Sequence, residues 1–442
     1  MLIAYLAAVV HAQSDAHQKT SPTPSPSPTP SAPPTPLESD DAAALYEDAS
    51  KFLERRFAEF NRQGLPYSPA RELMTREEQR ELAGEHAARL MARGRLKGED
   101  YYYLGLLYQL AGKPASVEAS LRRFLSETAK HKNADKLKLQ LARRVLTETA
   151  AREGLLEDAE AYFADYAQGE PRNPLDTFRL RLALAAAYDR AKQFDRAAEH
   201  ARAAFELAKV AGTTGGDYVQ RAQLVNAAGV TLADLLARQK RDADALAVAR
   251  ELLALGLTLP AANVYANAVE LLVTSGHAEA VERSIEESAA HAETAPEIEV
   301  KDWLDAKPTT LASLRGRVVL LDFWATWCEP CRETMPRLAK LQDRYGERGL
   351  SVVGLTEFYG ATDGKSEAAE LKEIADFKKS LRLPYAVGVG ANAATALRYG
   401  VRALPTTFVI DRRGVVRYVL VGGGASANDL LESVVKILLD EK

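Results

Sequence analysis

Residues 318–331 read VVLLDFWATWCEPC and carry the strongest fold signal in the sequence. The first part of this stretch is a continuous apolar run with β-branched residues and one acid, Asp322, which is typical of a buried central strand. The only two cysteines of the chain, Cys328 and Cys331, follow this strand, and a helix is expected over 328–345. Unpaired backbone N–H groups and the helix dipole favour a thiolate at a helix N-terminus. The stretch therefore predicts a reactive cysteine pair at a strand-to-helix junction.

The residues around the first cysteine fit this chemistry. Pro330 suits the first turn of a helix, where its missing N–H costs nothing. Cys331 follows one helical turn later, close enough to attack a mixed disulfide on Cys328 and release the product. Glu329 either opposes thiolate formation slightly through its like charge or is simply a solvated surface residue.

Other uses of a cysteine pair fit the sequence less well. Structural zinc needs four ligands, so with no second cysteine pair only a site shared between subunits could bind it. A peroxiredoxin would carry Pro-x-x-x-Thr-x-x-Cys, whereas Thr326 lies only two residues before Cys328. A permanent structural disulfide would close a very short loop and stabilise little. Thiol-disulfide exchange is therefore the preferred interpretation.

Residues 296–442 alternate between the two kinds of secondary structure. Further strands are expected at 350–355, 406–410 and 415–421, and helices at 367–381, 393–399 and 429–439. Strands that alternate with helices predict an α/β sandwich.

The motifs of this region resemble those of the thioredoxin superfamily. Residues 322–331 (DFWATWCEPC), with Arg332 and Pro336 after them, are similar to the active-site segment of TlpA/ResA-like thiol:disulfide oxidoreductases. The segments LASLRGRV at 311–318 and YGVRALPTTFVID at 399–411 match the same family in the same order. The resemblance spans about a third of the chain. It implies a thioredoxin fold over 296–442 and dithiol–disulfide exchange, with the cysteine pair as the redox group and no cofactor.

The same resemblance implies roles for particular residues. Pro405 corresponds to a cis-proline that faces the cysteines, and the backbone of Leu404 before it pairs with an extended client. Trp327 frames the surface beside the cysteines. Asp322 matches a buried acid that passes a proton to or from Cys331, because a desolvated carboxyl has a raised pKa. The alternative for Asp322 is a strand acid that is satisfied by local hydrogen bonds.

Two positions depart from the family pattern. Thr334 stands where many members carry a glutamate, and Gly354 stands where thioredoxin has a lysine near its buried acid. Asp322 is therefore expected to act with less electrostatic help. The polar segment 357–366 (EFYGATDGKS) follows the second strand and either shapes client access or decorates the surface.

Residues 39–295 are rich in Ala, Leu, Glu and Arg at helical spacing, which predicts an all-α region. Two stretches, 104–112 and 184–197, resemble the tetratricopeptide repeat, and comparable turns occur near Gly154, Lys240 and Gly276. Their spacings depart from that repeat's period, so we expect a degenerate, tetratricopeptide-like array. Its surface either docks a peptide or protein or serves as a spacer or dimerisation unit.

The first residues predict export. Residues 1–18 contain a short apolar run before small residues, similar to a secretory signal peptide without a basic start. Residues 19–38 alternate proline with Ser and Thr and are expected to form an extended, unfolded linker or tail. We therefore expect an extracytoplasmic protein in a bacterial periplasm or cell envelope.

The composition limits the partners. The chain of 442 residues carries 57 basic and 61 acidic side chains, with a net charge of -4, so a nucleic-acid binder is not expected. The resemblance implies protein thiols or disulfides as clients, mostly in the reducing direction, and a further thiol protein that supplies or accepts electrons. The alternative function is a non-catalytic adaptor, in which the helical array binds a partner and the thioredoxin-like module is passive.

Overall fold

The computed structural model describes residues 40–65, 67–210, 218–277, 279–287, 294–360, 365–422 and 425–441. The predicted leader at 1–18 and linker at 19–38 lie outside the described residues. The described residues divide between Ala204 and Phe205 into two compact units, here called the helical unit (residues 40–204) and the redox unit (residues 205–441). In the part of the chain that the structure describes, every helix is too short or too polar to cross a membrane.

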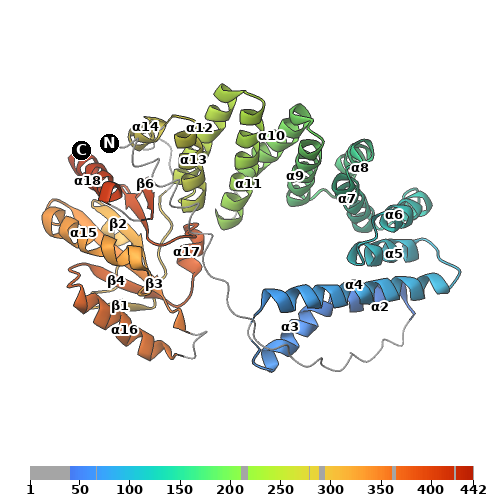
Figure 1. Ribbon diagram of the computed structural model, residues 1–442, viewed down its shortest axis with the longest axis horizontal. Helices are drawn as coiled ribbons and strands as arrows, with labels where there is room; N and C mark the ends of the chain where they lie inside the picture. The colour runs from blue at the N-terminus through green and yellow to red at the C-terminus, as the bar shows by residue number, and fades with distance from the viewer. Residues whose placement is uncertain are drawn as a thin grey trace. The chain divides into compact units, whose positions relative to one another are not determined.

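The helical unit contains only helices among its described residues (Figure 1). They are α2 (Ala42–Ser50), α3 (Phe52–Arg62), α4 (Pro69–Ala92), α5 (Glu99–Leu110), α6 (Pro114–Thr128), α7 (Lys136–Glu153), α8 (Leu156–Gln168), α9 (Pro174–Arg190) and the first part of α10 (Phe194–Val210). Gly112, Gly154 and Lys192 adopt left-handed backbone conformations after α5, α7 and α9. The turns predicted near Gly154, Lys240 and Gly276 are therefore present, since Lys240 and Gly276 have the same conformation.

Consecutive helices of this unit pack closely as pairs. A Cβ atom at Gly105 of α5 would collide with the side chain of Leu121 in α6, so the contact between the two helices needs a residue without a side chain there. Within α5, Tyr102 is buried and its neighbours Tyr101 and Tyr103 are partly exposed, because successive residues of a helix point in different directions. The tetratricopeptide identity of the array stays a prediction.

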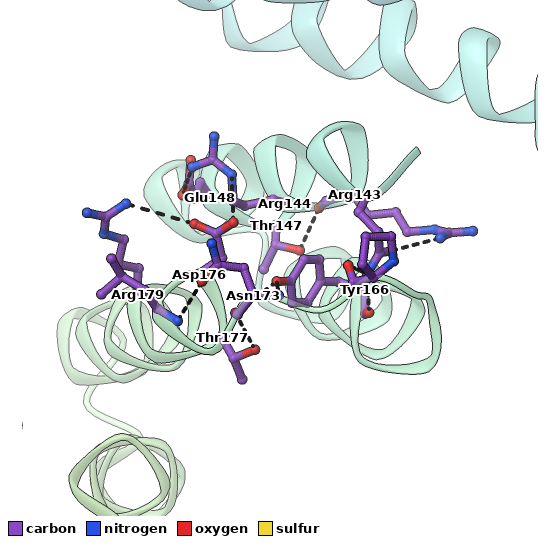
Figure 2. A network of polar contacts seen from close by, with 12 residues as sticks. Arg143, Arg144, Thr147, Glu148, Tyr166, Asn173, Asp176, Thr177 and Arg179 are labelled. Atoms are coloured by element: carbon purple, nitrogen blue, oxygen red, sulfur yellow. Dashed lines mark hydrogen bonds and ion pairs between the residues drawn. The ribbon is translucent and has the colours of Figure 1, made fainter. Parts of the chain in front are cut away.

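A polar network ties α7, α8 and α9 together (Figure 2). Arg144 of α7 pairs with Glu148 at 2.9 Å and approaches Asp176 of α9 at 3.9 Å. The Tyr166 hydroxyl of α8 lies 3.3 Å from the carbonyl oxygen of Asn173, whose side chain caps α9. The network therefore fixes three successive helices by contacts between side chains as well as by their apolar packing.

The redox unit contains a six-stranded mixed sheet in the order β1-β4-β3-β2-β5-β6 (Figure 1). Its strands are β1 (Asp302–Leu304), β2 (Val318–Phe323), β3 (Leu350–Glu357), β4 (Ala386–Gly390), β5 (Thr406–Ile410) and β6 (Val416–Val421). β2 pairs with β3, and β3 with β4, in parallel; the other neighbours are antiparallel. Every residue of β2 is buried, as expected for a central strand.

Four helices follow the strands of this sheet: α15 (Glu329–Tyr345), α16 (Glu367–Ser380), α17 (Ala394–Arg398) and α18 (Ala425–Asp440). The strands predicted at 318–323 and 406–410 have those bounds. The strand predicted at 350–355 extends to Glu357, and the helix predicted from 429 begins at Ala425.

The sequence did not predict β1 and β4. β1 has three residues, and β4 contains two glycines, so neither has the usual strand pattern. Gly388 of β4 is needed for packing, because a Cβ atom there would lie 2.9 Å from the side chain of Val300.

The last helices of the all-α region belong to the redox unit. They are α11 (Tyr218–Arg238), α12 (Asp242–Thr258), α13 (Ala262–Thr274) and α14 (Glu279–Glu287). The Tyr265 ring of α13 packs edge-on against Tyr418 of β6, with ring centroids 5.9 Å apart. The Ala262 N–H donates to the Tyr399 carbonyl at 2.9 Å. Composition changes between residues 295 and 296, but the compact unit begins about ninety residues earlier, because these helices pack on the sheet.

Candidate active site

The two cysteines form a disulfide at the start of α15, with an S–S distance of 2.04 Å. Cys328 is the N-cap of α15, and its Sγ accepts a hydrogen bond from the Cys331 N–H at 3.3 Å. Pro330 occupies the first turn, as predicted. Cys331 is completely buried and Cys328 is 4% exposed, so Cys328 is the sulfur closer to solvent, although it is less exposed than an attacking thiol was expected to be.

The charged residues beside the pair are solvated. The Glu329 side chain is 79% exposed and lies 3.8 Å from the guanidinium of Arg332. Arg332 donates a hydrogen bond to the Thr326 carbonyl at 2.8 Å. The position of Glu329 favours the interpretation of this residue as a solvated surface group.

Pro405 and Trp327, which the resemblance places beside the disulfide, lie in distant parts of the sequence. The Leu404–Pro405 peptide bond is cis, as the resemblance implies, and Pro405 is buried directly before β5. β5 pairs with β2, the strand that leads to Cys328. Trp327 is 62% exposed, and its ring packs edge-on against Tyr359 with centroids 5.5 Å apart.

A pocket adjoins this group of residues. Its lining combines apolar and polar side chains: Phe323, Trp324, Leu355, Leu404, Glu299, Thr356, Glu357, Tyr359, Asn392 and Thr395, with Gly390 and Ala396. Burial raises the pKa of Glu357, and a hydrogen bond with the Tyr359 hydroxyl opposes this rise. The beginning of the polar segment 357–366 therefore contributes to the pocket, while residues 361–364 lie outside the described part of the chain.

Asp322 lies in β2 and is completely buried. The Thr407 hydroxyl of β5 donates a hydrogen bond to Oδ1 at 2.7 Å. Burial raises the pKa of Asp322 to about 7, and the bond from Thr407 opposes this rise. A carboxyl that titrates near neutral pH can accept or donate a proton at physiological pH.

The two departures from the family pattern also have a structural setting. The Thr334 hydroxyl is buried and donates to the Pro330 carbonyl at 3.1 Å, so it is satisfied within α15. Gly354 pairs with Asp322 in the register of β2 and β3. A Cβ atom at Gly354 would lie 3.0 Å from Trp324 Nε1, so the indole occupies the space beside the acid.

Two tyrosines that help to build this region, Tyr359 and Tyr385, were not predicted from the sequence. Tyr385 precedes β4, a strand that the sequence did not predict, and Tyr359 follows β3 in a segment for which surface decoration was an open alternative. Neither carries a local motif that could have identified it. Among the described residues, no three His, Cys, Asp or Glu side chains gather closely enough to hold a metal ion.

The fold and the disulfide at the start of α15 define a thioredoxin-like redox protein. Residues 292–419 match the AhpC/TSA family. The thioredoxin-like protein YneN of Bacillus subtilis is 36% identical over 128 residues, which cover 29% of this chain and 69% of the relative. The thiol-disulfide oxidoreductase ResA of Bacillus cereus is 34% identical over 130 residues, which cover 29% of this chain and 68% of the relative.

A similar solved structure is a putative thiol:disulfide interchange protein DsbE from Chlorobium tepidum. It is 28% identical, covers 33% of this chain and 96% of its own, and has a TM-score of 0.29. With its relatives, the present chain belongs to the thioredoxin-like thiol-disulfide oxidoreductases, and it is an enzyme of this class.

Proposed function

We propose that the protein reduces disulfides of client proteins by exchange with its own cysteine pair. The observation that carries this proposal is the Cys328–Cys331 disulfide at the N-terminus of α15, directly after β2, the strand that pairs with β5 behind the cis-proline Pro405. Unpaired N–H groups and the dipole of α15 stabilise a thiolate at Cys328. The more exposed sulfur of the pair is the one that a client must reach.

The reaction proceeds in two displacements. The Cys328 thiolate attacks the client disulfide, a mixed disulfide forms, and one client thiolate leaves. Cys331 then attacks Cys328 Sγ, so the internal disulfide forms and the second client thiolate leaves. The client gains two electrons, and Asp322 accepts the proton of the Cys331 thiol. A further thiol protein must return two electrons to the pair for the next cycle.

Trp327, Leu404 and Pro405 form the surface on which the client lies. Trp327 is exposed, Leu404 lines the adjacent pocket, and Pro405 precedes β5. We assign the backbone of Leu404 the role of pairing with an extended client segment. Glu329 and Pro330 support this arrangement, since Pro330 fits the first turn of α15 and Glu329 stays in solvent.

The chain has only two cysteines, so a single substitution leaves one thiol for the decisive experiment. In a Cys331→Ser variant the only thiol is Cys328, so every client disulfide adduct must form there. We expect wild-type protein to accelerate insulin reduction by dithiothreitol, Cys328→Ser to return the rate to the uncatalysed value, and Cys331→Ser to accumulate adducts that dithiothreitol releases. No acceleration by the wild type would contradict the proposal and favour the passive adaptor.

The helical unit is assigned to docking of a client or of the electron-donating partner. Three large apolar side chains support this assignment: Tyr67, Leu73 and Met74 are 71%, 70% and 64% exposed at the start of α4. We expect a Leu73→Ser/Met74→Ser variant to lower the adduct yield with protein clients while it reduces a small aromatic disulfide at the wild-type rate. Equal adduct yields would contradict docking of a client on this surface.

The reaction is assigned to an extracytoplasmic compartment, the bacterial periplasm or cell envelope. This assignment rests on the leader-like pattern at 1–18. Fractionation of cells that express the full chain, compared with a variant that lacks residues 2–18, tests it. Equal retention of both proteins in the cytoplasm would contradict export.

A further inference from the structure

The buried side chains of Trp324 and Tyr385 lie near Asp322, beside Gly354. Asp322 of β2 lies opposite Gly354 of β3 in the parallel register, so both residues face the same side of the sheet. A Cβ atom at Gly354 would lie 3.0 Å from Trp324 Nε1 and 3.3 Å from Tyr385 Cε2. The absence of a side chain at Gly354 therefore lets an indole N–H and a phenol ring approach the acid.

Each of these three side chains has a polar atom without a partner among the described residues. The atoms are Asp322 Oδ2, Trp324 Nε1 and the Tyr385 hydroxyl. Trp324 and Asp322 are completely buried, and Tyr385 is 3% exposed. A buried polar atom without a hydrogen bond costs free energy, so three of them in one place indicate a common partner. One acceptor and two donors are a suitable set for an enclosed water molecule.

The two donors are held in place by the surrounding elements. The Trp324 ring stacks on Phe377 of α16, with centroids 5.5 Å apart and an angle of 19° between the planes. The guanidinium of Arg332 lies 5.5 Å from the centroid of the same Phe377 ring. Tyr385 directly precedes β4, in which Val387 pairs with Gly354. The donor positions are therefore set by packing and by strand register.

The groups that face Asp322 are neutral and differ in acidity. β5 supplies the neutral donor Thr407, and the segment before β4 supplies Tyr385. Burial and the charge of Asp322 raise the pKa of Tyr385 well above its usual range, so Tyr385 keeps its proton and remains a donor at neutral pH. In the proposed reaction the other titrating group is the thiol of Cys331 in α15.

We propose that Tyr385 is a positioning residue for proton transfer: its O–H, with the Trp324 N–H, stabilises the Asp322 carboxylate through an enclosed water molecule. This proposal rests on the proposed function. When Cys331 attacks the mixed disulfide, the bond between Cys331 Sγ and Cys328 Sγ forms and the bond from Cys328 Sγ to the client sulfur breaks. The thiol proton of Cys331 passes to Asp322, and the client leaves as a thiolate. Two neutral donors thus stabilise the Asp322 carboxylate at the place where thioredoxin has a lysine.

The test is a Tyr385→Phe variant, which keeps the ring and removes the hydroxyl. We expect the pKa of Asp322, followed by carbon NMR of the labelled carboxyl in the oxidised full chain, to rise by about one unit, which is a tenfold change in its ionisation constant. The release of a client from its mixed disulfide by Cys331 at pH 7, followed in a single turnover, then slows about fivefold, and its pH profile moves upward by the same unit. Trp324→Phe, which removes the other donor, gives a second reading in the same direction.

The matched control is Tyr265→Phe. Tyr265 of α13 also has a buried hydroxyl without a partner among the described residues, but it packs against Tyr418 of β6. We expect this variant to leave the pKa of Asp322 and the release rate unchanged. An unchanged pKa in Tyr385→Phe, or equal shifts in both tyrosine variants, would overturn the proposal.

The NMR titration separates this proposal from the proposed function. If wild-type protein exchanges disulfides and Tyr385→Phe leaves the pKa of Asp322 unchanged, the positioning role fails and the oxidoreductase function stands. If the pKa rises as expected but wild-type protein exchanges no client disulfide, the client-directed function fails and the contact between Tyr385 and Asp322 stands.

Discussion

The two ends of β5 lie beside two buried aspartates with opposite surroundings. Near its start, Thr407 gives Asp322 a single hydrogen bond, and the second carboxylate oxygen has no partner among the described residues. After its end, Asp411 is 4% exposed, and its Oδ1 accepts from the N–H groups of Arg413 and Val415 at 2.9 Å each.

The second aspartate also has a buried cation. The guanidinium of Arg417 in β6 lies 3.4 Å from Asp411 Oδ2 and is itself paired with Glu441 at 2.8 Å. The same residue type therefore serves two purposes at the two ends of one strand. A carboxylate with several donors and a cation holds the turn between β5 and β6, whereas a carboxyl with one donor is left able to change its protonation near neutral pH.

The largest expected effect is the contribution of Asp322 to the pH dependence of the free energy of unfolding. Asp322 has a folded-state pKa of about 7, above its ordinary value of 3.8, so the native state holds its proton more tightly than the unfolded state. The contribution of Asp322 to the free energy of unfolding should therefore be largest below about pH 4 and fall by about 4 kcal/mol as the pH rises to 7. Chemical denaturation at several pH values should show this fall in the wild type and lose it in Asp322→Asn. An identical pH dependence in both proteins would contradict the raised pKa.

Removal of the Asp411 carboxylate should lower the free energy of unfolding and leave thiol-disulfide exchange unchanged. Asp411→Ala leaves two N–H groups of the turn without their acceptor and takes one anion from the buried Arg417, at a cost of about 3 kcal/mol. Urea denaturation measures this loss. Asp411→Asn is the matched control, because it keeps the acceptor for the turn and should recover part of the loss. The insulin reduction rate of the folded variant should equal that of the wild type.

Asp322→Asn, in contrast to Asp411→Ala, should lower the rate of thiol-disulfide exchange. An amide cannot accept the proton of Cys331, so release of a client from its mixed disulfide at pH 7 should slow by about 10²-fold, within the usual contribution of a general base. The measurement is single-turnover release of a fluorescent client peptide. A rate within twofold of the wild type would show that the proton goes elsewhere.

The smallest effect is expected at the exposed contact of Asp411. The Arg413 side chain is 62% exposed and lies 3.4 Å from Asp411 Oδ2. Such solvated pairs contribute little, so Arg413→Ala should change the free energy of unfolding by less than about 0.5 kcal/mol. A loss as large as that of Asp411→Ala would mean that the turn depends on this side chain rather than on Arg417.

The parts of the redox unit that the sequence predicted correctly carry local signals. The apolar run of β2, the spacing of Cys328 and Cys331, and the strand at 406–410 are each visible within a few residues. β1 and β4 were missed because one is very short and the other is rich in glycine. The helix starts were less accurate, since Cys328 is a cap rather than the first helical residue.

The surroundings of Asp322 could not be predicted in the same way. The departure at Gly354 was visible in the sequence, but the groups that replace the lysine come from Trp324 and from Tyr385, which lies outside any motif. Register between strands, rather than spacing along the chain, brings them together. For the same reason composition did not indicate that α12 and α13 pack on β6.

The packing of α12 and α13 on β6 limits where the chain can be shortened. β6 is the last strand of the sheet, and uncovered edges of this kind invite pairing with other molecules. A fragment that begins at residue 296, where the composition changes, would lack α12 and α13. The surface of β6 around Tyr418, against which Tyr265 packs, would then be exposed. The cut would also remove Ala262 from the segment that leads into Pro405. Self-association and a loosened client surface are the expected defects of such a shortened protein.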